Sequence, residues 1–356
     1  MTSDRATDDS AADGRAASDS AAGDGASSTT ASSRTASSDG AASAGVPARG
    51  VHIPLITPFD AAGEVALDAL EALAHDMLSA GAAGLVALGT TAEVATLSAA
   101  EKDAVVRRLA RVCRERGAPL MVGAGNNDTA ASRDALAALG KVPEVAAALT
   151  LVPYFTRPSA AGVVAHFTEL AANSPVPLVI YHIPYRTGQE LGADTLRTLG
   201  ALPGVVGVKY ATGGIDAATV DLLGELPDGF AVFAGDDLFF SPLLAMGAHG
   251  GILASAHLAT GRYVELAGAW AAGDLTRARH LGHRLAALSA ALFAEPNPTV
   301  VKGVLHAQGR IPTASLRLPL LPAGPGAVDE ALRLLAGEEP GPAEVRGSAP
   351  GLTAAS

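Results

Sequence analysis

Short apolar runs alternate with amphipathic stretches along most of this chain, and this pattern constrains the fold more than any other feature. The apolar runs lie at Ile53–Phe59, Leu85–Leu88, Leu120–Val122, Ala148–Val152, Leu178–Ile183, Val205–Val208, Phe230–Phe233 and Ile252–Ala254. Stretches with helical periodicity between them include Leu67–Ser79, Ala99–Arg116, Gly162–Ala172 and Ala217–Leu226. Strands that alternate with helices indicate right-handed βαβ units and a parallel sheet.

Eight such units within roughly 220 residues fit an α/β fold of the (β/α)8 TIM-barrel type, which typically takes about 250 residues. A doubly wound open sheet is the alternative, but no GxGxxG fingerprint follows the first apolar run. Beyond the eighth unit, three further stretches have helical patterns, at about Leu275–Phe293, Thr299–Gln308 and Ala327–Leu335. They predict a small helical region after the barrel.

The domain organisation follows from these patterns and from composition. We expect a catalytic barrel over residues 51–272 and a C-terminal helical region over 273–336. Residues 1–50 are mostly Ala, Ser, Asp, Gly and Thr, which cannot bury enough apolar surface to offset the entropy of ordering. We predict a disordered tail there and a second flexible tail over 337–356. The first tail lacks the apolar core of a signal peptide, so a cytoplasmic location is expected.

Charge and residue usage exclude several classes of function. The net charge of −11 argues against a nucleic-acid partner. No apolar run approaches the roughly 20 residues of a membrane helix, so no membrane partner is expected. The single cysteine, Cys113, lies in a helical pattern and is predicted to be a buried structural thiol. Asp236 and Asp237 have no histidine or third acid at ligand spacing, so we predict a loop or helix-capping role and no metal site.

Unusual residues cluster where the predicted strands end. In TIM barrels, function lies at the carboxyl ends of the strands. The segments at those ends are Gly89–Glu93, Pro153–Pro158, Tyr181–Gly188, Lys209, Gly235–Asp237 and Gly250–Ile252. Because all of them would meet at one face of one barrel, they predict an active site there.

Lys209 is the strongest candidate among them, because it ends a short apolar strand. Lysine is almost never buried without a partner. Desolvation lowers the pKa of a lysine amine, which frees it to form a Schiff base with a carbonyl substrate. The alternative is a lysine whose aliphatic stem lies on the strand while its amine reaches solvent.

Neighbouring strand ends supply side chains for the rest of such a site. The phenol of Tyr181 is suited to proton transfer, although it could equally be a core aromatic residue. Thr90 and Thr91 open a loop before a helix, where hydroxyls and backbone N–H groups hold carboxylates, or simply cap the turn. Arg186 offers a bidentate fork for a second carboxylate, or it forms a surface ion pair.

These segments, in order and spacing, resemble the dihydrodipicolinate synthase and N-acetylneuraminate lyase family of class I aldolases. The resemblance runs from about Val51 to Leu321. The segments that carry it are Leu55–Phe59, Gly89–Glu93, Pro153–Pro158, Tyr181–Gly188, Gly207–Gly213, Gly235–Asp237 and Glu295–Lys302. Within the family, Arg186 and Glu295–Pro298 resemble the synthase branch. That branch condenses pyruvate with aspartate semialdehyde on the route to diaminopimelate and lysine.

The resemblance also implies roles for particular residues. Lys209 would form an imine with pyruvate, Tyr181 would move protons, and Thr90 would link Tyr181 to a proton relay. Thr91 and the backbone near Ile252 would hold the pyruvate carboxylate. No metal or organic cofactor is implied, and the family resemblance suggests a homotetramer built from dimers, or a homodimer.

Three positions depart from the family pattern. Phe155 stands where the family has a relay tyrosine contributed across a subunit interface, and Tyr154 resembles the neighbouring interface tyrosine. Ala92 replaces a glycine, whose backbone freedom the turn could require. His182 replaces an asparagine, either as an acid–base group or as an inert hydrogen-bonding residue, and we favour the inert role.

These departures leave alternatives to the synthase open. One is a related aldolase, lyase or dehydratase that acts on another 2-keto acid or sugar acid. Another is a barrel that binds a keto acid without turnover, an idea that the loss of a transferable proton at Phe155 supports. Positioned acid–base groups typically contribute about 10²–10⁴-fold in rate, so this loss is chemically significant.

Feedback inhibition by lysine is expected to be weak. Val94, Ala99 and Ala131 lie where the resemblance implies polar or charged contacts to that effector. We predict little change in initial rate when L-lysine is titrated through its physiological range. Strong inhibition in that range would contradict this prediction.

Overall fold

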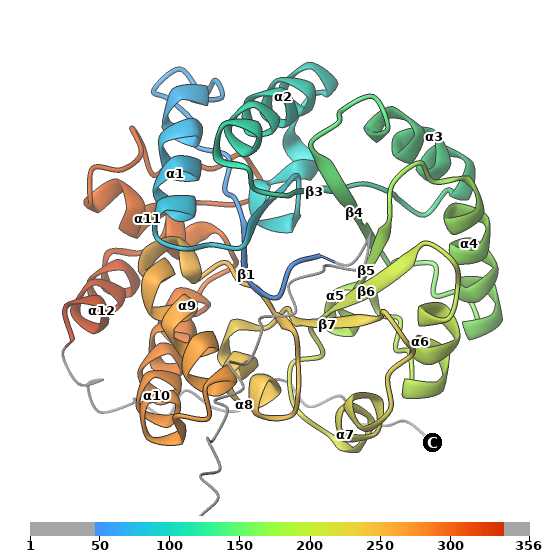
Figure 1. Cartoon of the computed structure of the whole chain (residues 1–356). Helices are drawn as coiled ribbons and strands as arrows, with labels where there is room; N and C mark the ends of the chain where they lie inside the picture. Colours follow the sequence, from blue (N-terminus) through green and yellow to red (C-terminus); the bar gives the residue numbers. More distant parts are fainter. Residues whose placement is uncertain (1–46, 338–356) are drawn as a thin grey trace, which may run out of the picture. The chain divides into compact units, whose positions relative to one another are not determined.

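The computed structural model describes residues 47–337, and its centre is a closed barrel of eight parallel strands in sequential order (Figure 1). The predicted TIM barrel is thus confirmed. The strands are β1 (Gly50–Pro54), β2 (Gly84–Ala87), β3 (Leu120–Gly123), β4 (Val145–Leu151), β5 (Leu178–His182), β6 (Val205–Tyr210), β7 (Ala231–Ala234) and β8 (Gly250–Ile252). Most of residues 1–50 and 337–356, where we expected tails, lie outside the described part.

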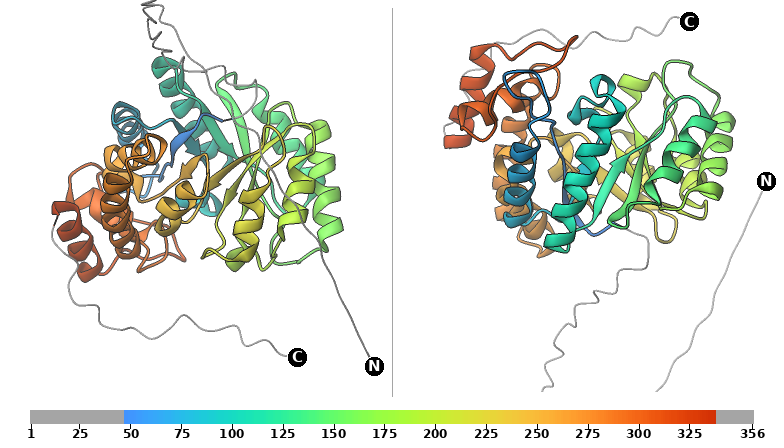
Figure 2. Two further views of the ribbon diagram at one scale, coloured as in Figure 1. Left: turned by 60° about the horizontal axis from the view of Figure 1, so that its bottom comes forward. Right: turned by 90° about the horizontal axis from the view of Figure 1, so that it is seen from above.

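Helices surround the strands, and the C-terminal helices form a group at one side of the ring (Figures 1 and 2). The helices are α1 (Leu67–Ser79), α2 (Ala99–Arg116), α3 (Thr129–Leu139), α4 (Ala160–Asn173), α5 (Pro184–Thr187), α6 (Ala193–Gly200), α7 (Ala217–Gly224), α8 (Phe240–Ala245), α9 (Ala256–Ala271), α10 (Leu275–Leu292), α11 (Thr299–Ala307) and α12 (Pro325–Ala336). Short 3-10 turns are η1 (Thr90–Ala92), η2 (Val94–Thr96) and η3 (Asp237–Phe239). Among residues 47–337, no helix has both the length and the apolarity to cross a membrane.

Local sequence signals explain several helix boundaries. Helix α2 begins at a capping box, in which the Ser98 side chain accepts from Glu101 N and the Glu101 carboxylate accepts from Ser98 N. It ends at Gly117, which adopts the left-handed conformation favoured by glycine. Cys113 is buried on the inner face of this helix, and burial raises the pKa of its thiol to about 12. The predicted structural thiol is confirmed.

The first and last strands differ from the apolar runs that predicted them. Strand β1 ends at Pro54, before most of the predicted run, and β8 begins at Gly250 and ends at Ile252. These strands close the barrel through the pairs Gly50–Gly250 and Val51–Gly251. A Cβ atom on Gly250 would lie 1.9 Å from the carbonyl oxygen of Gly50. The close approach therefore requires glycine, which carries no hydrophobic signal.

Alternating side chains divide the core into two layers. Val179 and Tyr181 of β5 point into the barrel, where they join an inner cluster with Val86, Met121, Ala147, Leu149, Ile183, Ala211, Ala231, Phe233 and Ile252. Leu178 and Ile180, at the alternate positions, pack outward against the helices. Lys209 is directly opposite Tyr181 in the β5–β6 register. This register brings a lysine into the interior layer, at the carboxyl end of its strand.

The C-terminal helices pack against the last part of the barrel. Helix α10 contacts α8, α9 and η3, while α11 contacts α9 and α12. Figure 2 shows this group alongside the helices of the barrel rather than apart from them. The segment between α10 and α11 therefore lies close to the strand ends.

Candidate active site

A pocket at the carboxyl ends of the strands collects most of the predicted site residues. Its lining residues are Thr90, Thr91, Tyr181, Tyr185, Arg186, Lys209, Gly235, Asp237, Ile252, Ala254, Phe293 and Asn297. Six of these were predicted from the sequence: Thr90, Thr91, Tyr181, Arg186, Lys209 and Ile252. Tyr154 and Phe155 do not line it.

Lys209 places a buried amine in the pocket. The residue is only 6% exposed, and its Nζ lies 4.3 Å from the centroid of the Tyr181 ring. Among residues 47–337 no salt bridge includes this amine, although its positive charge opposes the burial effect on the pKa values of the nearby carboxylates of Asp236 and Asp237. Because buried lysines in structural roles are paired, an unpaired one in a cleft indicates a reactive amine.

Gly235, immediately after β7, makes the space that the lysine occupies. A Cβ atom at this position would lie 2.9 Å from Cγ and 3.1 Å from Cε of Lys209, and 2.8 Å from Cβ of Ala211. Contacts this short force a neighbouring atom to move. Gly235 therefore determines the path of the lysine side chain into the pocket.

The turn after β2 forms one wall. Thr91 is buried, and its Oγ1 accepts a hydrogen bond from Nδ2 of Asn297 at 2.9 Å. Thr90 is exposed towards the pocket, and no hydrogen bond joins its side chain to Tyr181 among the described residues. Ala92 does not need glycine's backbone freedom, because the left-handed residues of this turn are Leu88 and Glu93, both at φ 54°, and not Ala92.

Two adjacent carboxylates link the loops around the pocket. Asp237 is fully buried, and one of its oxygens accepts a 2.5 Å hydrogen bond from Ser255 N. Asp236 accepts from the Tyr185 hydroxyl at 3.1 Å and from Gly213 N at 2.7 Å. Asp236 makes no side-chain capping bond to η3, whereas Asp237 binds the backbone N–H of Ser255, the N-cap residue of α9, so both side chains act as loop or helix-start contacts, as predicted.

Burial changes the ionisation of these groups. It raises the pKa of Asp237 to about 6 and also raises the pKa of Asp236. Burial and the Asp236 carboxylate together raise the pKa of Tyr185, which keeps its hydroxyl protonated as a donor. Burial lowers the pKa of His182 to about 4, so the ring is neutral near pH 7. His182 lies against Tyr210 and does not line the pocket, which supports the inert role.

The remaining candidates lie on loops. Arg186 is exposed at the end of α5, with its Cζ 5.8 Å from the Tyr185 ring, and it faces the pocket. Phe155 is 88% exposed and has a positive φ of 65°. Tyr154 is 38% exposed, and Asn127 holds its backbone through two hydrogen bonds of 2.8 Å. A relay through Tyr154 or Phe155 within this subunit has no support in the structure.

The sequence analysis did not predict some of the residues that line the pocket. Phe293, the C-cap residue of α10, gives no local sign of a site, because the sequence pattern includes it at the end of an amphipathic helix. Tyr185 and Asn297 lie in the segments Tyr181–Gly188 and Glu295–Lys302, which carry the family resemblance. Their hydrogen-bond partners are distant in sequence, so the sequence alone could not identify them. Among residues 47–337, no group of three or more His, Cys, Asp or Glu side chains could hold a metal ion.

An unpaired buried amine at the carboxyl end of a parallel barrel defines a class of enzyme, the Schiff-base lyases of class I aldolase type. The profile of the Dihydrodipicolinate synthetase family matches residues 47–335. The chain belongs to this family.

Individual relatives agree with this assignment. The 4-hydroxy-tetrahydrodipicolinate synthase 2 of Clostridium acetobutylicum is 38% identical over 77% of this chain and 94% of its own length. The crystal structure of dihydrodipicolinate synthase from Thermotoga maritima has a TM-score of 0.78 and 31% identity, covering 82% of this chain and 98% of that one. A synthase from Acinetobacter baumannii, complexed with pyruvate, has a TM-score of 0.77 and 33% identity, covering 81% and 99%.

Adding a methyl group at Gly235 should displace the lysine. We predict that Gly235→Ala lowers keto-acid turnover by about 10²-fold, since misplacing a reacting group by about 1 Å has effects of that size. Circular dichroism should show that the fold is retained. Gly268→Ala is the matched control, because a Cβ atom there meets nothing within 4 Å. Full activity in Gly235→Ala would contradict this account.

Asp237 should make stability depend on pH. Its folded-state pKa of about 6 exceeds the usual 3.8, so the folded protein binds more protons than the unfolded chain between those values. This contribution to stability is present below about pH 4 and is lost as the pH rises through about 6. Asp237→Asn removes the buried charge and should exceed the wild type in unfolding free energy by roughly 3 kcal/mol at pH 7, but not at pH 4.

Urea unfolding at both pH values measures this difference. The exposed Asp228→Asn is the control and should change stability by less than about 0.5 kcal/mol at either pH. Equal effects of Asp237→Asn at pH 4 and pH 7 would exclude a buried charge as the cause.

Proposed function

We propose that this protein is a 4-hydroxy-tetrahydrodipicolinate synthase, which condenses pyruvate with aspartate 4-semialdehyde in the diaminopimelate and lysine pathway. The single observation that carries the proposal is the buried, unpaired amine of Lys209 beside Tyr181. The names of the relatives support the choice of reaction, and the pyruvate complex of the Acinetobacter baumannii synthase supports the first substrate. We also propose a cytoplasmic location.

The first half of the reaction forms an imine. The Lys209 amine attacks C2 of pyruvate, and the carbonyl oxygen leaves as water after protonation, a proton that the phenol of Tyr181, whose ring centroid lies 4.3 Å from the amine, would supply. The turn that carries Thr91 and the backbone near Ile252 would hold the pyruvate carboxylate. Loss of a methyl proton then gives an enamine, with the imine nitrogen as electron sink, so no metal or organic cofactor is needed.

The second half joins the carbon skeletons. The enamine carbon attacks the aldehyde carbon of aspartate semialdehyde, and the aldehyde oxygen takes a proton to become a hydroxyl group. The amine of the bound substrate then attacks the imine carbon, which closes the ring and releases Lys209. Arg186, at the pocket mouth, is proposed to bind the carboxylate of this second substrate.

Phe155 favours a second candidate for the aldehyde substrate. The residue has no transferable proton, and with Tyr154 it forms an adjacent pair of exposed aromatic side chains at the position where the resemblance implies a subunit contact. We propose a homotetramer or homodimer on this basis. If the relay across that contact is broken or rerouted, a related aldolase or lyase acting on another aldehyde is the alternative, with the same Lys209 chemistry.

Lys209 can be tested directly. Borohydride with pyruvate should fix one covalent adduct on Lys209, detected by peptide mass spectrometry. Lys209→Arg should form no adduct and should lose more than about 10³-fold in kcat, because it retains the charge without the nucleophile. The exposed Lys141→Arg is the matched control and should behave as wild type.

The two candidate functions are separated by the second substrate. Consumption of aspartate semialdehyde in a coupled assay supports the synthase. Adduct formation without that consumption supports the alternative aldehyde. Absence of an adduct in the wild type would refute both and favour a barrel that binds keto acids without turnover.

A further inference from the structure

A buried charge cluster connects the turn after β2 to the C-terminal region. Glu93 occupies the left-handed conformation between η1 and η2, at φ 54° and ψ 36°. This conformation costs a non-glycine residue about 1–2 kcal/mol, so the surroundings must hold it in place. The side chain of Glu93 is 1% exposed. A carboxylate is therefore fixed within two residues of Thr91, in the pocket wall.

Both oxygens of this carboxylate are bound by residues that follow the barrel. Oε1 accepts from Nζ of Lys302, in α11, at 2.6 Å. Oε2 accepts from the backbone N–H of Arg317 at 2.9 Å. The Lys302 amine also donates to the carbonyl of Ser315 at 2.8 Å and lies 4.1 Å from the centroid of the Phe59 ring. Burial lowers the pKa of Lys302 to about 8, an effect that Glu93 opposes, so the amine is still charged near pH 7.

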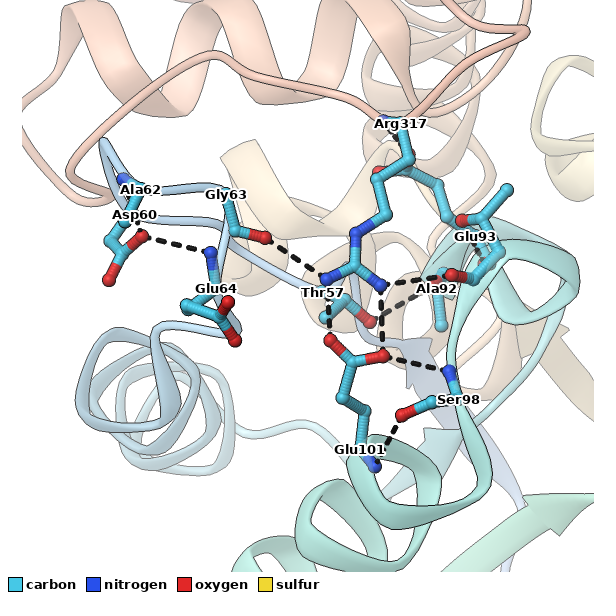
Figure 3. Close-up of polar contacts among 11 residues, drawn as sticks. Thr57, Asp60, Ala62, Gly63, Glu64, Ala92, Glu93, Ser98, Glu101 and Arg317 are labelled. Atoms are coloured by element: carbon cyan, nitrogen blue, oxygen red, sulfur yellow. Dashed lines mark hydrogen bonds and ion pairs between the residues drawn. The ribbon is translucent and has the colours of Figure 1, made fainter.

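Arg317 extends the connection to the start of α2. Its guanidinium donates to both oxygens of Glu101, at 2.9 and 2.5 Å, and to the carbonyls of Thr96 and Gly63 at 2.9 and 3.0 Å. Figure 3 shows Arg317 between Gly63 and Glu101, with Glu93 and Ala92 on the adjoining segment. The turn is thus held against the segments that precede and follow it.

The same C-terminal segment also contacts the pocket side of the turn. Asn297 donates to Oγ1 of Thr91, and Lys302 pairs with Glu93. These two contacts hold the turn at Thr91 and Glu93, which are two residues apart. The turn presents Thr90 and Thr91 to the pocket that contains Lys209.

We propose that Glu93 and Lys302 are positioning residues, which hold the Thr90–Ala92 turn in the geometry that binds the keto-acid carboxylate. This inference rests on the proposed function. A buried ion pair adds little net stability, whereas its removal from one side leaves an uncompensated charge. The pair is therefore better explained by what it orients than by what it stabilises.

The test replaces both charges together by groups of similar shape. In the double variant Glu93→Gln, Lys302→Met, the glutamine still accepts from Arg317 N while the ion pair is lost. We expect the KM for pyruvate to rise at least about tenfold with kcat changing less than about threefold, because binding at the turn is weakened while Lys209 is untouched. Borohydride should still fix the adduct at saturating pyruvate.

The matched control is the double variant Arg114→Met, Glu144→Gln. It removes an ion pair of 2.5 Å between α2 and the start of β4, in which the arginine side chain is 66% and the glutamate side chain 11% exposed; neither residue lines the pocket, so KM and kcat should be unchanged. If the buried double variant does not fold, Arg317→Met provides the test. It loosens the same segment from Glu101 and should raise the KM for pyruvate about threefold.

The outcomes separate the inference from the proposed function. A folded variant with wild-type KM, whether or not its melting temperature falls, would show that the pair is only structural and would overturn the inference. A rise in KM restricted to the buried variants supports it. A wild-type protein that forms no pyruvate adduct would instead refute the proposed function.

Discussion

The parallel register that sets Tyr181 beside Lys209 is the constraint on which the rest of the structure depends. Closure of the barrel directs both side chains into an interior layer of apolar residues, where the amine forms no salt bridge among the described residues. The same closure depends on glycines where β8 meets β1, and the space for the lysine depends on a glycine after β7. A few glycine positions therefore determine both the closure of the barrel and the location of the lysine side chain.

The pocket is completed by residues that come after the eighth barrel unit. Phe293 and Asn297 form part of its wall, and Lys302 and Arg317 bind the carboxylate of Glu93 from behind. The rigid strands position the reactive amine, while contacts distant in sequence position the turn opposite it. The C-terminal helices thus belong to the active site as much as to the scaffold.

The sequence predicted those parts of the molecule that short-range patterns encode. Alternating apolar runs predicted the barrel, and the strand-end rule located Lys209, Tyr181, Thr91 and Arg186. It could not locate β8 correctly, because a glycine strand has little hydrophobic signal. It predicted only a loop or helix-capping role for Asp236 and Asp237, because their partners, Tyr185, Gly213 and Ser255, are known only from the folded chain. We expected that Ala92 could require the backbone freedom of glycine, but it is Glu93 that has the positive φ.

Helix α5 is a single turn of four residues, yet it carries Tyr185 and Arg186 to the mouth of the pocket. The reactive amine is on a strand, so mutations in α5 alter the entrance without disturbing the nucleophile. Under the proposed function, this separation would allow preference for the incoming aldehyde to change through a few codons in an evolving lineage, while imine chemistry is inherited unchanged.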